Sequence, residues 1–131
     1  MNIYDCFMYF DEDLLLDLRL NILDKYVKKF VISEATYLHS GKEKKLKFDI
    51  KNFSKFKDKI IYIVVDKHPP GIQNISSDDI FETKNKKILD NSLKRENNQR
   101  NQLLNGLQDA DENDLILSSD LDEIPDLSKF K

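Results

Sequence analysis

Four short apolar runs are spaced along the chain, at residues 3–9, 30–32, 60–65 and 115–117. They consist mainly of β-branched, aromatic and leucine residues, and charged or turn-forming residues bound them on both sides. A continuous apolar run of this length is typical of a strand that is buried on both faces of a sheet. We therefore predict four strands, of which the run at 60–65 gives the strongest signal.

Helical periodicity separates the first two of these runs. Acidic residues at 11–13 favour the start of a helix, which we expect to reach about Tyr26. Its apolar face is broad enough to pack on a sheet. The predicted stripe consists of Leu14, Leu15, Leu18, Ile22 and Tyr26, widened by Leu16, Leu20, Leu23 and Val27.

A second helix, or a broken pair of helices, is predicted after the third apolar run. Ser76, Ser77 or Asp78 provides its N-cap, and Gly106 provides its C-cap. Its middle, residues 94–102, has no apolar side chain. This composition is typical of a helix that is solvated all round or that lines a polar site.

The remaining segments complete the predicted order of elements. We expect a solvated loop at residues 36–47. One or two helical turns that pack on the sheet are predicted around Phe53 and Phe56, and a further element is predicted to begin at residue 126. The order β-α-β-(α)-β-α-β is the pattern of a three-layer α/β domain with a mostly parallel sheet. Its crossovers are expected to be right-handed.

Composition narrows the possible functions. The 131 residues suffice for a single domain, and 21 basic against 24 acidic residues give a net charge of −3. This balance gives no electrostatic case for binding nucleic acid or an anionic membrane. No window approaches the roughly 20 apolar residues of a membrane span, and the amino end lacks the pattern of a signal peptide. We expect a cytoplasmic protein in which Cys6, the single cysteine, is a core residue.

Candidate chemistry lies directly after the last apolar run, where Asp120, Asp122 and Glu123 precede Pro125. In open α/β sheets, ligands bind at the carboxyl ends of the strands. Asp120 and Asp122 are two apart, so both side chains can lie on one side of an extended segment and share one cation. Hard oxygen ligands suit Mg²⁺ or Mn²⁺, which in turn suit diphosphates. The alternative is a solvated acidic turn.

A series of short segments over nearly the whole chain resembles, in the same order, glycosyltransferase family 17, the family of the bisecting β-1,4-N-acetylglucosaminyltransferase. The segments are residues 3–7, the helix with Glu12, Leu15, Arg19 and Leu20, and residues 30–34, 41–42, 53–59, 64–66, 95–96, 99–101 and 115–125.

The resemblance implies a three-layer, Rossmann-like GT-A fold that binds a nucleotide sugar. It implies inverting transfer of N-acetylglucosamine from a UDP-sugar donor to a glycan acceptor, with Asp120 and Asp122 as ligands of Mn²⁺ or Mg²⁺. Family members carry a second half that should hold the acceptor site and a catalytic base. We therefore expect residues 1–131 to be a partial, donor-binding domain whose base lies beyond Lys131. Apolar surface left uncovered predicts a homo-oligomer or a partner chain.

Arg100 and Asn101 are candidate contacts for the donor. A guanidinium group matches phosphate oxygens, so Arg100 is expected to pair with the diphosphate, and Asn101 follows the same argument. The alternative for Arg100 is an i, i+4 ion pair with Glu96 on a solvated helix. Glu123 is a candidate partner of the metal ligands, with a free surface carboxylate as its alternative.

Further candidates lie at the ends of the first two strands. Tyr9 or Phe10 is expected to stack on the uracil ring, with a core position as the alternative, and Glu34 is expected to contact the nucleoside. His39 and His68 are lone loop histidines without a second ligand at zinc-like spacing. We expect both histidines to be solvated.

Two other functions fit parts of the pattern. An Asp-nucleophile phosphatase of the haloacid dehalogenase type also uses Asp-X-Asp after an apolar strand. Those enzymes normally place that strand first, whereas here it is the fourth. A non-catalytic domain that binds a sugar nucleotide or a partner protein is the second alternative.

Overall fold

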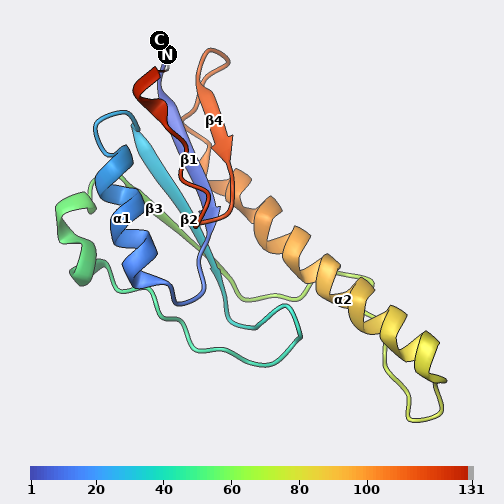
Figure 1. Ribbon diagram of the computed structural model, residues 1–131. Helices are drawn as coiled ribbons and strands as arrows, with labels where there is room; N and C mark the ends of the chain where they lie inside the picture. Colours follow the sequence, from blue (N-terminus) through green and yellow to red (C-terminus); the bar gives the residue numbers. More distant parts are fainter. Residues whose placement is uncertain (130–131) are drawn as a thin grey trace.

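All four predicted strands are present in the computed structural model, which describes residues 1–129. They are β1 (Ile3–Met8), β2 (Lys29–Ala35), β3 (Ile60–Val65) and β4 (Leu115–Ser118). The strands form one sheet in the order β3-β2-β1-β4, and every neighbouring pair is parallel (Figure 1). The prediction of an α/β fold is confirmed, and within the described residues the sheet is entirely parallel.

Helices cover both faces of this sheet, as Figure 1 shows. Within residues 1–129, the α-helices are α1 (Asp13–Leu23) and α2 (Phe81–Asn101). The same residues also form short 3₁₀ helices, namely η1 (Ile50–Phe56), η2 (Gln102–Gly106) and η3 (Leu127–Lys129). Residues 130–131, part of the last predicted element, lie outside the described residues. Within residues 1–129, no helix has the length and apolarity required to cross a membrane.

Helix α1 ends at Leu23, before the predicted end at Tyr26, because the chain closes into a turn there. The amides of Tyr26 and Val27 both donate to the carbonyl of Leu23, at 3.0 and 3.1 Å. The buried residues of the helix are Leu16, Leu20 and Leu23 together with Arg19. Four of the predicted stripe residues, Leu14, Leu15, Leu18 and Ile22, are instead exposed. Both sets recur at helical spacing, so periodicity alone could not separate them.

The predicted capping residues of the second helix form a separate turn before it. The carboxylate of Asp79 accepts from the Ser76 amide at 2.9 Å and pairs with Lys87 at 2.8 Å, and the helix begins only at Phe81. Its N-terminal half projects beyond the sheet (Figure 1). Several of its large apolar side chains are exposed, namely Phe81, Ile88, Leu89 and Leu93.

The sheet separates two cores, which makes the domain three-layered. Helices α1 and η1 pack on one face through Leu16, Leu20 and Phe53. On the other face, Leu103 of η2 packs on Tyr4 and on Cys6, a core residue as predicted. Burial raises the pKa of the Cys6 thiol to about 12, and the nearby Asp5 carboxylate adds to this effect.

Gly106 allows η2 to lie directly on the sheet. It does not adopt the positive φ expected of a glycine C-cap, a conformation found here at Gly41 and Gly71. A Cβ at Gly106 would lie only 2.4 Å from Cγ1 of Val31 and 3.2 Å from Cγ2 of Ile61. The glycine is therefore required for close packing and not for reversal of the chain.

A Gly106→Ala variant is expected to lose about 1–3 kcal/mol of unfolding free energy, the usual cost of overpacking a tight core. Urea denaturation measures this loss. Asn105→Ala, at the neighbouring exposed position, is the matched control and should change stability by less than about 0.5 kcal/mol. Equal stability of the two variants would contradict the close contact with Val31.

Candidate functional site

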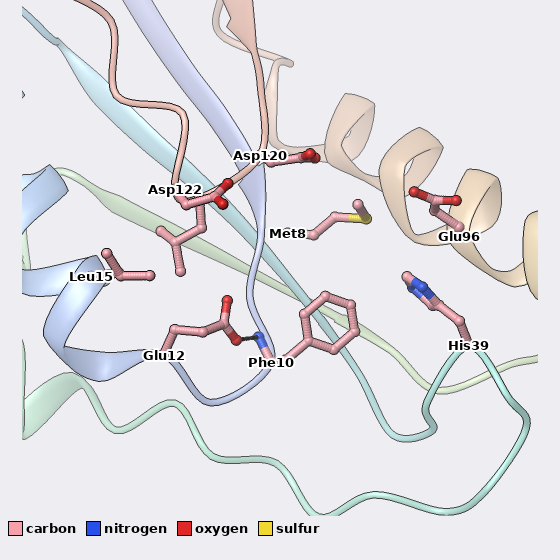
Figure 2. Close-up of a pocket in the computed structure, with 9 residues that line it drawn as sticks. Met8, Phe10, Glu12, Leu15, His39, Glu96, Asp120 and Asp122 are labelled. Atoms are coloured by element: carbon pink, nitrogen blue, oxygen red, sulfur yellow. Dashed lines mark hydrogen bonds between the residues drawn. The ribbon is translucent and has the colours of Figure 1, made fainter.

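A cavity of about 360 Å³ lies where β1 and β4 end side by side, at the carboxyl edge of the sheet. This is the edge at which parallel α/β sheets bind ligands. Figure 2 shows the residues that line the cavity and the elements that carry them. They are Met8, Phe10, Glu12, Leu15, His39, Glu96, Asp120, Leu121 and Asp122.

Asp120 and Asp122 lie on the loop that follows β4, and both line the cavity with exposed side chains. Figure 2 shows Asp120 directed across the cavity toward Glu96 on α2. The loop is a hydrogen-bonded turn, in which the Glu123 amide donates to the Asp120 carbonyl at 2.9 Å. The Asp120 amide in turn donates to Oε1 of Glu123 at 2.9 Å. Glu123 therefore closes the turn that presents the two aspartates.

Four carboxylates surround the cavity, because Glu12 and Glu96 face the two aspartates across it (Figure 2). Oε1 of Glu12 accepts from the amides of Phe10 and Asp11, at 3.0 and 2.6 Å, which fixes the approach to α1. Sequence reasoning assigned no role in the cavity to either glutamate. Side chains of one sign at such density repel one another unless positive charge lies among them.

Arg100 supplies positive charge beside this cluster. Its Nη2 atom lies 3.2 Å from Oε1 of Glu96 and 4.0 Å from Oδ1 of Asp120. The i, i+4 ion pair proposed as the alternative is therefore formed, and it also places the guanidinium next to Asp120. Neither Arg100 nor Asn101 lines the cavity itself, because both line a separate hollow together with Cys6 and Leu103. Arg100 reaches the acidic cluster only through its contacts with Glu96 and Asp120.

His39 forms one wall of the cavity, although its position in the sequence predicts only a solvated loop. Its ring packs edge-on against Phe10, with ring centroids 5.0 Å apart. Nε2 of His39 lies 3.0 Å from Oε1 of Gln99, whose Nε2 donates to the carbonyl of Ser33 at 3.1 Å. Since Oε1 of Gln99 can only accept, Nε2 of His39 is the donor in this contact.

Tyr9 and Glu34 do not line the cavity, in contrast to the expectation that they contact the nucleotide. Tyr9 is fully buried, and its hydroxyl donates to Asp13. Burial is the main reason that the pKa of Tyr9 is raised, and the bond to Asp13 adds to it. Phe10 is thus the only one of the two predicted stacking aromatics that reaches the site.

Glu34 holds a neighbouring loop to β2. Its buried carboxylate accepts from the amides of Lys47 and Phe48, at 2.6 and 3.0 Å, and from the Tyr62 hydroxyl at 2.6 Å, and it pairs with Lys44. Both carboxylate oxygens of Glu34 are therefore already hydrogen-bonded within the protein. The other lone histidine, His68, stacks on Tyr37 with centroids 4.0 Å apart, outside this cavity.

Among residues 1–129, no group of three or more His, Cys, Asp and Glu side chains is arranged to hold a metal ion. Mg²⁺ does not require such a group, because it is usually bound through one or two carboxylates and completed by substrate phosphates and water. Asp120 and Asp122 provide such a pair of hard oxygen ligands on one cavity. The donor set therefore fits a cation that enters together with a diphosphate.

Comparison with protein-family models matches residues 1–131 to Glycosyltransferase family 17. No curated protein and no solved structure matches the chain. The family match covers the whole chain and agrees with the Rossmann-like α/β fold. It also decides between the enzyme classes that the Asp-X-Asp pattern left open, in favour of glycosyl transfer over phosphate-ester hydrolysis. The chain belongs to glycosyltransferase family 17 and is a glycosyltransferase.

Proposed function

We propose that the cavity beside β4 binds a UDP-sugar, UDP-N-acetylglucosamine, together with Mn²⁺ or Mg²⁺ held by Asp120 and Asp122. The enzyme would transfer the sugar, with inversion, to a glycan acceptor. The observation that carries this proposal is the position of both aspartates on one cavity, at the carboxyl edge of a parallel sheet, in a chain of a glycosyltransferase family.

The negative charge of the cavity lining is the reason that we include a cation in the proposed complex. The carboxylates of Glu12, Glu96, Asp120 and Asp122 line the cavity, and a diphosphate brought among them without a counter-charge would be repelled. Arg100 offsets only part of this charge, because it is already paired with Glu96. Binding of the donor is therefore expected to require the cation.

The residues of the chain have distinct roles in this arrangement. Asp120 and Asp122 orient the donor through the cation, which, when bound, stabilises negative charge on the departing diphosphate as a Lewis acid. Arg100 lies beside Asp120, where its guanidinium group can donate to phosphate oxygens. Phe10 offers an apolar ring face to the sugar or the base, backed by His39.

Calorimetric titration with UDP-N-acetylglucosamine in the presence of Mn²⁺ is the experiment that tests this function. We expect saturable binding that EDTA abolishes, and weaker binding of GDP-mannose under the same conditions. Binding with equal affinity in EDTA, or no binding with Mn²⁺, would refute the proposal. Metal-dependent binding without transfer of N-acetylglucosamine to any glycan acceptor would instead identify a non-catalytic binding domain.

A further inference from the structure

A fully buried arginine, Arg19 of α1, lies directly beneath the loop that carries the two aspartates. Its Nε and Nη2 atoms donate to the two carboxylate oxygens of Asp5 on β1, at 2.8 and 2.7 Å. Neither side chain has any exposed surface. The positive charge of Arg19 is therefore neutralised by Asp5 inside the domain, and the two hydrogen bonds fix the position of the guanidinium group.

The remaining donors of Arg19 all turn to the acidic loop. Nη1 lies 2.8 Å from the carbonyl oxygen of Asp120, 3.2 Å from that of Leu121 and 3.0 Å from that of Glu123. Nη2 also donates to Oγ of Ser119 at 2.7 Å. Every N–H group of the guanidinium thus has an acceptor, and most of these acceptors belong to residues 119–123.

These contacts determine how the loop presents its side chains. Backbone carbonyls that converge on one buried cation fix the peptide planes of the loop, and the side chains of Asp120 and Asp122 are left on the cavity side (Figure 2). A loop that is already held in one conformation loses less conformational entropy when a ligand binds.

We propose that Arg19, paired with Asp5, is a positioning residue that holds residues 119–123 in the conformation that binds the cation and the diphosphate. This inference rests on the proposed function. Lysine cannot replace the arginine, because a single ammonium group cannot reach the Asp5 carboxylate and the loop carbonyls at the same time. The residue touches neither donor nor acceptor and acts only through the loop.

The decisive variant is the double substitution Asp5→Leu/Arg19→Met, because removing both charges leaves no unpaired ion in the core and keeps the volume similar. The fold is expected to survive, while the loop loses its contacts with the guanidinium. Arg19→Lys is the companion variant. It keeps a positive charge opposite Asp5 but loses the several N–H groups with which the guanidinium contacts Asp5 and the loop at the same time. Asp79→Leu/Lys87→Met removes an ion pair of 2.8 Å at the far end of α2 and is the matched control.

Two readouts are required for each folded variant. Hydrogen exchange without ligand is expected to accelerate at the amides of Asp120 and Glu123, which bond within the loop. Affinity for UDP in the presence of Mn²⁺ is expected to fall by about 10–100-fold, the usual effect of losing a group that orients metal ligands. The control variant should change neither quantity.

Unchanged exchange and unchanged UDP affinity in folded Asp5→Leu/Arg19→Met would overturn the positioning role. So would an equal loss of affinity in the Asp79→Leu/Lys87→Met control. If the wild-type protein binds no UDP with Mn²⁺, the proposed function fails. The exchange rates of the loop then decide separately whether Arg19 holds it, since that measurement needs no ligand.

Discussion

Replacing Asp120 and Asp122 together by asparagine is expected to weaken UDP binding in the presence of Mn²⁺ by at least about 100-fold, since loss of the ligands should exceed the effect of losing their supports. Asparagine keeps the shape of each side chain but removes its charge. The fold should be unaffected, because the loop is held through the backbone of Asp120 and not through its carboxylate. Calorimetric titration measures the affinity, and thermal unfolding monitors the fold.

The matched control for this variant is Asp109→Asn/Glu112→Gln, which removes two exposed charges at the opposite end of β4. It changes the net charge of the protein equally but leaves the cavity intact. UDP affinity should therefore remain at the wild-type value. An equal loss in both variants would show that net charge, and not the aspartate pair, governs binding.

Asp5→Asn is expected to lower the free energy of unfolding by about 3–5 kcal/mol, because it leaves the buried charge of Arg19 without its partner. The pair is inaccessible to water, and Arg19 contacts both carboxylate oxygens. Urea denaturation at neutral pH measures the loss.

Asp24→Asn provides the comparison, because Asp24 also pairs with a basic residue, Lys59, at 3.0 Å, but at the partly exposed surface. Its loss should cost no more than about 1 kcal/mol. If Asp5→Asn lowered the free energy of unfolding no more than Asp24→Asn does, the buried Asp5–Arg19 pair would not be important for stability.

The strands could be predicted from the sequence because their signal is local. Runs such as residues 60–65 are apolar at every position, and this pattern has few interpretations in a soluble domain. The buried face of α1 could not be predicted in the same way, because leucines occur almost all round this helix. Which leucines are buried depends on the direction from which the sheet approaches, and the sequence of the helix does not contain that information.

In the candidate site, likewise, residues that are close together in the sequence could be predicted, whereas contacts between distant residues could not. Asp120, Asp122 and Glu123 form a pattern within four positions, so their place after a strand was visible in the sequence. Arg19 and Asp120 are 101 positions apart, and His39 and Gln99 are 60 apart. Such pairs meet only through the order of strands in the sheet. Glu34 lies at the end of β2 as expected, but its hydrogen-bond donors come from a loop that folds back over the strand end, and the sequence did not show that contact.

The most direct measurement is a crystal structure of the protein grown with MnCl₂ and UDP-N-acetylglucosamine, with anomalous scattering used to locate manganese. We expect one manganese peak within coordinating distance of the Asp120 or Asp122 carboxylate and of the nucleotide diphosphate. A nucleotide bound elsewhere, or manganese away from both aspartates, would contradict the proposed role of the cavity beside β4.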